Sequence, residues 1–175
     1  HSPPITNKGG SMTATATPTS IAFAAIDPRE QFLAAFGMEV ATTSRVLRAF
    51  PADNETLQPA PQSRNARDLA FIFVAEMGML LTGITTGFDW SKPPAFPPPP
   101  AKITDIIAMF DDMQKQVVAT VKGMTSEELL TGTVQFPSGP GQMGDMTKIA
   151  FMWMVLCDQI HHRGQMTVLM RQAGL

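Results

Sequence analysis

A run of prolines interrupts the middle of the chain. Six of its 15 prolines lie between Ser91 and Lys102, including four in a row from Pro97 to Pro100. Proline has no backbone N–H and a fixed φ, so this stretch excludes a continuous helix or a central strand. The sequence therefore predicts an extended, polyproline-like crossing on the surface, long enough to let the two helices that flank it run parallel.

Helical periodicity lies on both sides of this crossing. It is clearest over residues 103–122, where apolar residues are spaced four, three, four and four positions apart: Ile106, Phe110, Met113, Val117 and Val121. Similar spacing predicts helices over residues 29–49, 66–85 and 145–172. Four substantial helices without a clear strand predict an all-α fold, a four-helix bundle with a long Pro-rich crossover.

Local signals set the expected ends of these helices. Gly83 and Gly87 are expected to mark the end of the second helix. Thr125, followed three residues later by Glu128, predicts a short capped turn of helix. Residues 131–144 contain four glycines and two prolines and are expected to form a loop or a brief hairpin.

The last predicted helix is apolar on two opposite sides, so both sides must be covered. One stripe is expected to enter the core, and the other to meet a further helix, a ligand or a second subunit. Several methionines lie on or near this helix, which suits either core packing or an adaptable apolar cavity: Met143, Met146, Met152, Met154, Met166 and Met170. We therefore expect a homodimer, or a bundle with a small-molecule cavity.

Length and composition limit the classes of protein that this chain can belong to. We expect residues 1–20 to be a cloning remnant and a flexible N-terminus, and residues 21–175 to form a single domain. A formal net charge of −2 and a pI near 5.9 argue against nucleic-acid binding. No apolar stretch is long enough and sufficiently uninterrupted to predict a membrane span. The apolar neighbours of the single cysteine, Cys157, predict a buried, inert thiol. One cysteine cannot form an internal disulfide, which favours a cytoplasmic protein.

The segment from Asp158 to Gln165 contains the residues best suited to chemistry. Asp158 and His162 are four positions apart, so on a helix their carboxylate and imidazole share one face. Such a pair can bind a metal ion, or its members can satisfy one another through an ion pair or a hydrogen bond. His161 is expected on another side, and Gln159 and Arg163 are expected on the exterior or at a neighbouring subunit.

This segment, with the apolar run that ends in Leu169-Met170-Arg171, resembles the last helix of DinB-like helical bundles, and residues 66–76 resemble their second helix. The resemblance implies a four-helix bundle, often dimeric. It also implies one divalent metal ion bound by three histidines, one on the second helix and two spaced i, i+4 on the last. Relatives include thiol-dependent transferases and metal-dependent hydrolases, and many have no assigned activity.

In this chain the resemblance matches the three family histidines to Ile72, Asp158 and His162, so only His162 is retained. Isoleucine has no lone pair, and the resemblance therefore implies an altered or lost site. Glu76, one turn beyond Ile72, is the candidate for a replacement ligand. A Glu–Asp–His set would accept zinc, nickel, manganese or iron, and the alternative is no metal.

The sequence thus leaves two classes of function open. The first is a metal-dependent hydrolase or thiol-dependent transferase with an altered site. The alternative is a non-catalytic dimeric bundle that binds a small apolar ligand or serves as an interaction module.

Overall fold

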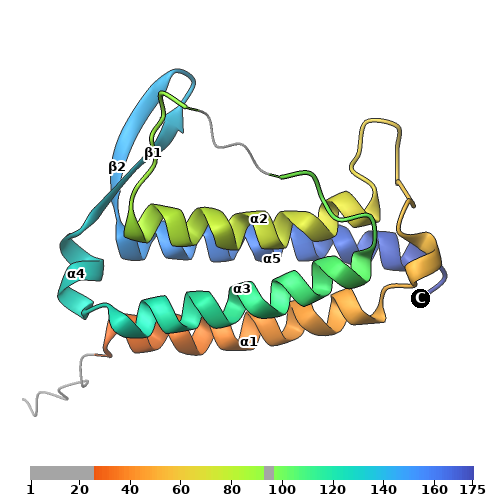
Figure 1. Ribbon diagram of the computed structural model, residues 1–175, viewed down its shortest axis with the longest axis horizontal. Coiled ribbons are helices and arrows are strands. Elements are labelled where there is room, and N and C mark those ends of the chain that lie inside the picture. Colours follow the sequence, from red (N-terminus) through yellow and green to blue (C-terminus); the bar gives the residue numbers. More distant parts are fainter. Residues whose placement is uncertain (1–25, 93–96) are drawn as a thin grey trace, which may run out of the picture.

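Four long helices form the body of the protein, whose structure is a computed structural model that describes residues 26–92 and 97–175 (Figure 1). The long helices are α1 (Pro28–Ala49), α2 (Ala66–Thr85), α3 (Ile103–Gly123) and α5 (Lys148–Gln172). The shorter elements are the 3-10 turn η1 (Ala52–Asn54), α4 (Ser126–Thr131), and the strands β1 (Thr133–Gly139) and β2 (Gln142–Thr147). The predicted all-α four-helix bundle is confirmed, with one small hairpin added to it.

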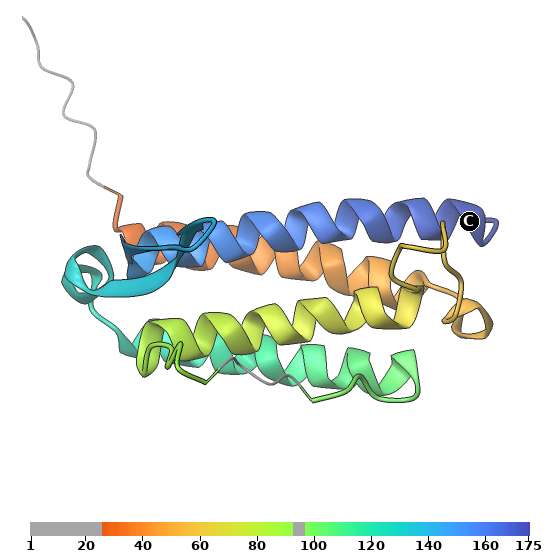
Figure 2. The ribbon, with the colours of Figure 1, turned by 90° about the horizontal axis from the view of Figure 1, so that it is seen from above.

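The helices are arranged as a ring in which α1 packs against α3 and α5, and α2 packs against the same two helices. Figures 1 and 2 show α2 and α3 running in the same direction, while α1 and α5 run in the opposite direction. The long crossing between α2 and α3 makes this parallel pair possible, as predicted. Residues 93–96 of the predicted polyproline run and residues 1–20 lie outside the described residues.

The core is built from the apolar stripes that the helical periodicity predicted. On α3, Ile106, Phe110 and Val117 are fully buried. Aromatic rings connect the helices: Phe73 of α2 packs edge-on against Phe110, and Phe32 of α1 packs edge-on against Trp153 of α5. Of the described helices, α2 is the one long and apolar enough to cross a membrane, but most of its apolar side chains are buried inside the bundle, which is typical of a core helix.

Gly83 does not end α2, contrary to the prediction. The helix continues to Thr85, and Gly87, with a positive φ of 73°, follows its end. Gly83 is buried, and a Cβ atom there would overlap the ring of Phe151 on α5. The glycine therefore allows α2 and α5 to approach closely, a role that only the packing of the two helices reveals.

The predicted hairpin exists, but it extends further than expected. β1 and β2 pair antiparallel from Thr133 opposite Thr147, through Gln135 opposite Asp145, to Gly139 opposite Gln142. Residues 145–147 are therefore strand, and the last helix begins at Lys148 rather than Asp145. The ladder fixes these residues in an extended conformation, and the Thr147 side chain then caps α5 by accepting from Ala150 N.

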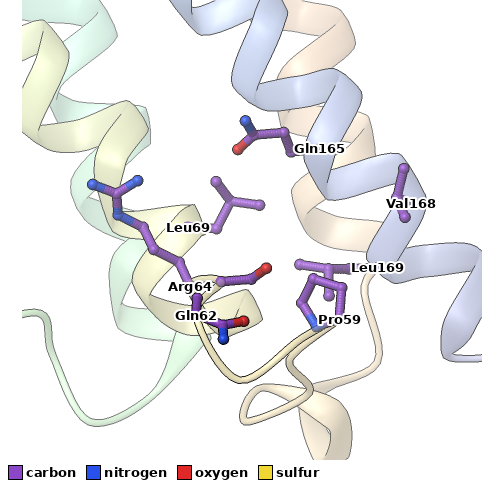
Figure 3. A pocket seen from close by; sticks show the side chains of 8 residues that line it. Pro59, Gln62, Arg64, Leu69, Gln165, Val168 and Leu169 are labelled. Atoms are coloured by element: carbon purple, nitrogen blue, oxygen red, sulfur yellow. The ribbon is translucent and has the colours of Figure 1, made fainter.

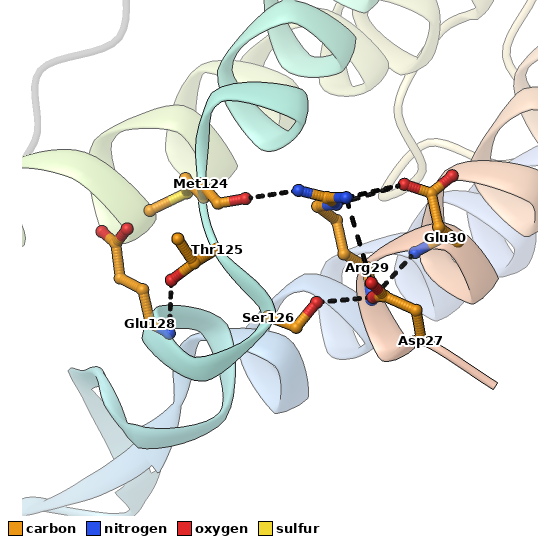
Figure 4. Close-up of polar contacts among 7 residues, drawn as sticks. All are labelled: Asp27, Arg29, Glu30, Met124, Thr125, Ser126 and Glu128. Atoms are coloured by element: carbon orange, nitrogen blue, oxygen red, sulfur yellow. Dashed lines mark hydrogen bonds and ion pairs between the residues drawn. The ribbon is translucent and has the colours of Figure 1, made fainter. Parts of the chain in front are cut away.

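The start of α1 is tied to the start of α4 (Figure 4). The Asp27 carboxylate accepts hydrogen bonds from Arg29 N at 2.8 Å and from Ser126 Oγ at 2.5 Å. These bonds, the Ser126 bond first, lower the pKa of Asp27. Arg29 Nη1 donates to Met124 O, and Thr125 Oγ1 accepts from Glu128 N, which confirms the predicted short capped helix.

Candidate metal centre

The relative position of α2 and α5 is fixed by two contacts near the candidate site. Toward the hairpin, Gly83 receives the Phe151 ring. At the level of the site itself, Gln159 is 3% exposed and its Nε2 donates to Phe73 O at 3.3 Å. The prediction that Gln159 lies on the exterior is therefore wrong, because its amide satisfies a backbone carbonyl of the neighbouring helix.

Beside the Gln159 contact, Glu76 of α2 faces Asp158 and His162 of α5. His162 Nε2 lies 3.1 Å from Glu76 Oε1 and 3.7 Å from Asp158 Oδ1. One potential ligand atom from each of the three residues lies within 4.8 Å of the other two. Glu76 is buried, whereas the Asp158 side chain is 54% exposed, so the site opens to solvent on the Asp158 side.

Glu76 is the residue whose environment is most unusual. Its burial, reinforced by the negative charge of Asp158 and by a hydrogen bond to it, raises the pKa of its carboxyl to about 9, against a weaker opposing effect of Arg64. Its Oε2 atom has no hydrogen-bond partner among the described residues. A buried carboxyl in this setting holds a proton at neutral pH, or binds a cation in its place.

Gln165 supports the histidine from the next turn of α5. Its Oε1 lies 3.3 Å from His162 Nδ1, and its Nε2 lies 2.9 Å from His161 Nε2. With the His162 proton on Nδ1 and directed to Gln165, the lone pair of His162 Nε2 points toward the two carboxylates. This is the usual arrangement around a metal-binding histidine, whose second nitrogen is oriented by an outer partner.

A model of the DinB family matches residues 19–175. This chain belongs to the DinB family. "Uncharacterized protein YrdA" of Bacillus subtilis is 26% identical to it over 146 residues, which are 83% of each chain.

Solved structures of the family agree in fold. A DinB-like protein from Bacillus cereus has 27% sequence identity and a TM-score of 0.69, covering 83% of this chain and 93% of that one. A DinB-like protein from Bacillus subtilis has 19% identity and a TM-score of 0.65 over the same shares of the two chains. At 19% identity, the Bacillus subtilis structure is evidence of a shared fold and of nothing more.

Within this DinB-family bundle, the residue of α2 that faces Asp158 and His162 is Glu76. Ile72 is half-buried and lines a different hollow, together with Pro97, Pro98 and Pro99 of the crossing. The structure thus brings together all three residues proposed from the sequence, and Ile72 lies one turn before Glu76 on α2.

The neighbouring residues of α5 have other roles. Arg163 binds α1 of the same chain, with Nη2 at 2.6 Å from Glu39 Oε2 and Nη1 at 3.3 Å from Thr43 Oγ1. His161 and Cys157 are exposed. The prediction of a buried Cys157 is wrong: apolar neighbours in sequence point to other sides of the helix, and position 157 lies outside the buried stripe.

A cavity of about 480 Å³ adjoins the centre on its open side. Asp158 and His161 form part of its wall, and Met79, Met154 and Phe136 supply apolar surface. Of the methionines of the last helix, Met154 therefore lines this cavity, whereas Met152 and Met166 are buried in the core. An apolar group placed in this cavity would lie directly beside the Asp158 carboxylate.

Proposed function

We propose that this protein is a metal-dependent enzyme of the hydrolase or thiol-transferase class, with a divalent ion held by Glu76, Asp158 and His162. The observation that carries this proposal is the convergence of an imidazole and an exposed carboxylate on a buried carboxyl whose Oε2 has no hydrogen-bond partner among the described residues. Two oxygen donors and one nitrogen donor suit zinc, nickel, manganese or iron.

The residues around such a centre would have different roles. Glu76 and Asp158 supply negative charge, and Gln165 holds the His162 ring in place. The apolar cavity beside Asp158 positions the substrate and restricts water. When bound, the ion supplies Lewis-acid chemistry, which activates a nucleophile or polarises a substrate oxygen.

Zinc titration of protein purified without a metal-affinity column tests this proposal. We expect one equivalent of Zn²⁺ per chain, and a decrease in affinity of about tenfold or more for His162→Ala, since one of three ligands is removed. His161→Ala is the matched comparison, because His161 is adjacent in sequence but lies outside the three-residue cluster, and its one hydrogen bond among the described residues is with Gln165, so its loss should lower the affinity much less. Isothermal titration calorimetry measures both constants.

Equal affinity in the wild-type and His162→Ala proteins would contradict this assignment of the metal centre. Sub-stoichiometric zinc in the wild-type chain would have the same consequence. In either case the second candidate function gains support: the binding of a small apolar ligand without catalysis. It rests on an apolar groove of about 420 Å³ between α1 and α3, lined by Phe36, Val40, Val118 and Ala119 among others.

We also propose that the chain forms a homodimer through α5. One of the two apolar stripes predicted on the last helix contains Trp153, Leu156, Ile160 and Gly164. Trp153 packs on α1 and Leu156 is buried, but Ile160 and Gly164 are exposed. A Cβ atom at Gly164 would meet nothing within 4 Å, so another backbone can approach it closely. We therefore place the dimer contact on this exposed half of the stripe.

Ile160→Glu is expected to convert the dimer to a monomer, because it places a charge at the centre of the proposed contact. Met38→Glu, at an exposed apolar position of α1, is the control and should leave the dimer intact. Light scattering at micromolar concentration measures the mass. A monomeric wild-type protein, or an unchanged mass in Ile160→Glu, would refute the α5 contact.

A further inference from the structure

A cavity larger than the one beside Asp158 lies between the start of α2 and the end of α5. Its volume is about 620 Å³, within the range of small-molecule sites. The loop between α1 and α2 forms one wall, and the first turn of α2 and the end of α5 form the others (Figure 3). It is separate from the cavity beside Asp158, with which it shares no lining residue.

The lining combines one cation with neutral polar and aliphatic groups. Arg64 carries the only charge among the lining residues, and Gln62, Ser63 and Gln165 add neutral hydrogen-bonding groups. The aliphatic surface comes from Leu69, Val168 and Leu169, with Pro59 at the edge. In Figure 3, Arg64 rises along α2 on the side of the cavity opposite Val168 and Leu169.

Arg64 has no ion pair within the described part of the chain, whereas its neighbour Arg67 lies 3.3 Å from Asp68 Oδ1. Arg64 is exposed, but its loop is held in place: Gln58 Nε2 donates to Ser63 O at 2.5 Å, and Ser63 N donates to Ala60 O at 2.9 Å. The loop therefore holds a guanidinium without an ion pair beside a cavity whose lining residues include no acidic group, and the charge of Arg64 acts only weakly on Glu76. A guanidinium binds a carboxylate through two parallel hydrogen bonds.

We infer that this cavity binds a small aliphatic monocarboxylate, whose carboxylate pairs with Arg64 and whose hydrocarbon chain packs against Leu69, Val168 and Leu169. Gln62, Ser63 and Gln165 can donate further hydrogen bonds to the carboxylate oxygens. Gln165 also contacts His162, so the ligand would lie next to the candidate metal centre. The cavity does not require a metal ion, because Glu76, Asp158 and His162 are not among its lining residues.

Hexanoate is a suitable probe, and 1-hexanol is its neutral counterpart of similar length. The titration uses the full chain with EDTA present and follows ligand and amide signals by NMR, so its result does not depend on whether the metal centre exists. We expect hexanoate to bind about tenfold or more tightly than hexanol, and Arg64→Gln to remove that difference. Arg67→Gln is the matched control, since Arg67 is the adjacent arginine but is paired with Asp68, and it should leave hexanoate binding unchanged.

A second pair of variants tests the aliphatic wall. Val168 is 45% exposed, so a polar residue there can be tolerated. Val168→Glu should weaken hexanoate binding about tenfold by placing a like charge in the cavity, and Val168→Gln should weaken it much less. Equal binding of hexanoate and hexanol, unchanged binding in Arg64→Gln, or no hexanoate binding up to about 10 mM would overturn the inference. Failure of the zinc titration would leave the hexanoate result unaffected.

Discussion

In the absence of metal, the protein is expected to lose stability steadily as the pH rises from about 4.5 to about 9, and Glu76→Gln to remove most of that loss. The cause is the buried carboxyl of Glu76, whose pKa is about 9 in the folded chain and near 4.5 when unperturbed. Between these values the folded state keeps a proton that the unfolded state has released.

The sign follows from the proton counts. The unfolded state binds fewer protons in this pH window, so the free energy of unfolding decreases as the pH increases. The full contribution of the protonated carboxyl is present below about pH 4.5, and it is lost once the pH exceeds about 9. One pKa unit corresponds to about 1.4 kcal/mol, so the loss is on the order of 6 kcal/mol, a large part of the stability of a typical domain.

Urea denaturation of the wild-type and Glu76→Gln proteins in EDTA, at several pH values, measures this effect. The glutamine cannot release a proton, so the difference between the two curves isolates the titration of Glu76 from all others. The control is Glu127→Gln on α4, where the carboxyl is exposed, and it should follow the wild-type pH dependence. Parallel curves for wild-type and Glu76→Gln would show that Glu76 is ionised in the folded protein.

Metal binding should reverse this dependence. An ion that binds Glu76 replaces its proton, so zinc is expected to stabilise the chain more at pH 8 than at pH 6. The same carboxyl therefore destabilises the metal-free bundle at alkaline pH and becomes an anionic ligand when an ion is present.

The helices could be predicted from the sequence because each one carries its own periodic signal. The stripe from Ile106 to Val121 on α3 is local information, and so are the Thr125 cap and the prolines of the crossing. The boundary between the hairpin and the last helix could not be predicted in the same way. In the sequence, residues Asp145 to Thr147 continue the helical pattern, but in the structure they pair with β1. Local periodicity cannot decide between the two.

The candidate site was predictable only in part, for a similar reason. The i, i+4 spacing places Asp158 and His162 on one face, and the sequence offered Glu76 as a possible partner. The axial register between α2 and α5 is set by contacts such as Gly83 with Phe151 and Gln159 with Phe73 O. The periodicity of a single helix carries no information about its register against another helix. For this reason the sequence predicts the wrong environment for Gln159, and it does not reveal the contributions of Gln165 and Arg64. Gln165 did offer a signal, since it lies three residues after His162.

Glu76→His is expected to raise the zinc affinity of the protein about a hundredfold at pH 7, and Ile72→His to leave it unchanged. Zinc must displace the proton of Glu76, and a pKa of about 9 makes this unfavourable by about two powers of ten at pH 7. An imidazole at position 76 faces the same two residues without that cost. A histidine at position 72 would line the hollow formed with Pro97, Pro98 and Pro99, and would leave the protonated Glu76 in the cluster.

Competition with a chromophoric zinc chelator, at pH 7 and again at pH 9.5, measures both affinities. At pH 9.5 the wild-type carboxyl is largely ionised, so the advantage of Glu76→His should shrink to a small factor. A gain in Ile72→His instead would place the second-helix ligand one turn earlier, as the family resemblance implies, and would contradict the assignment of Glu76 as the ligand.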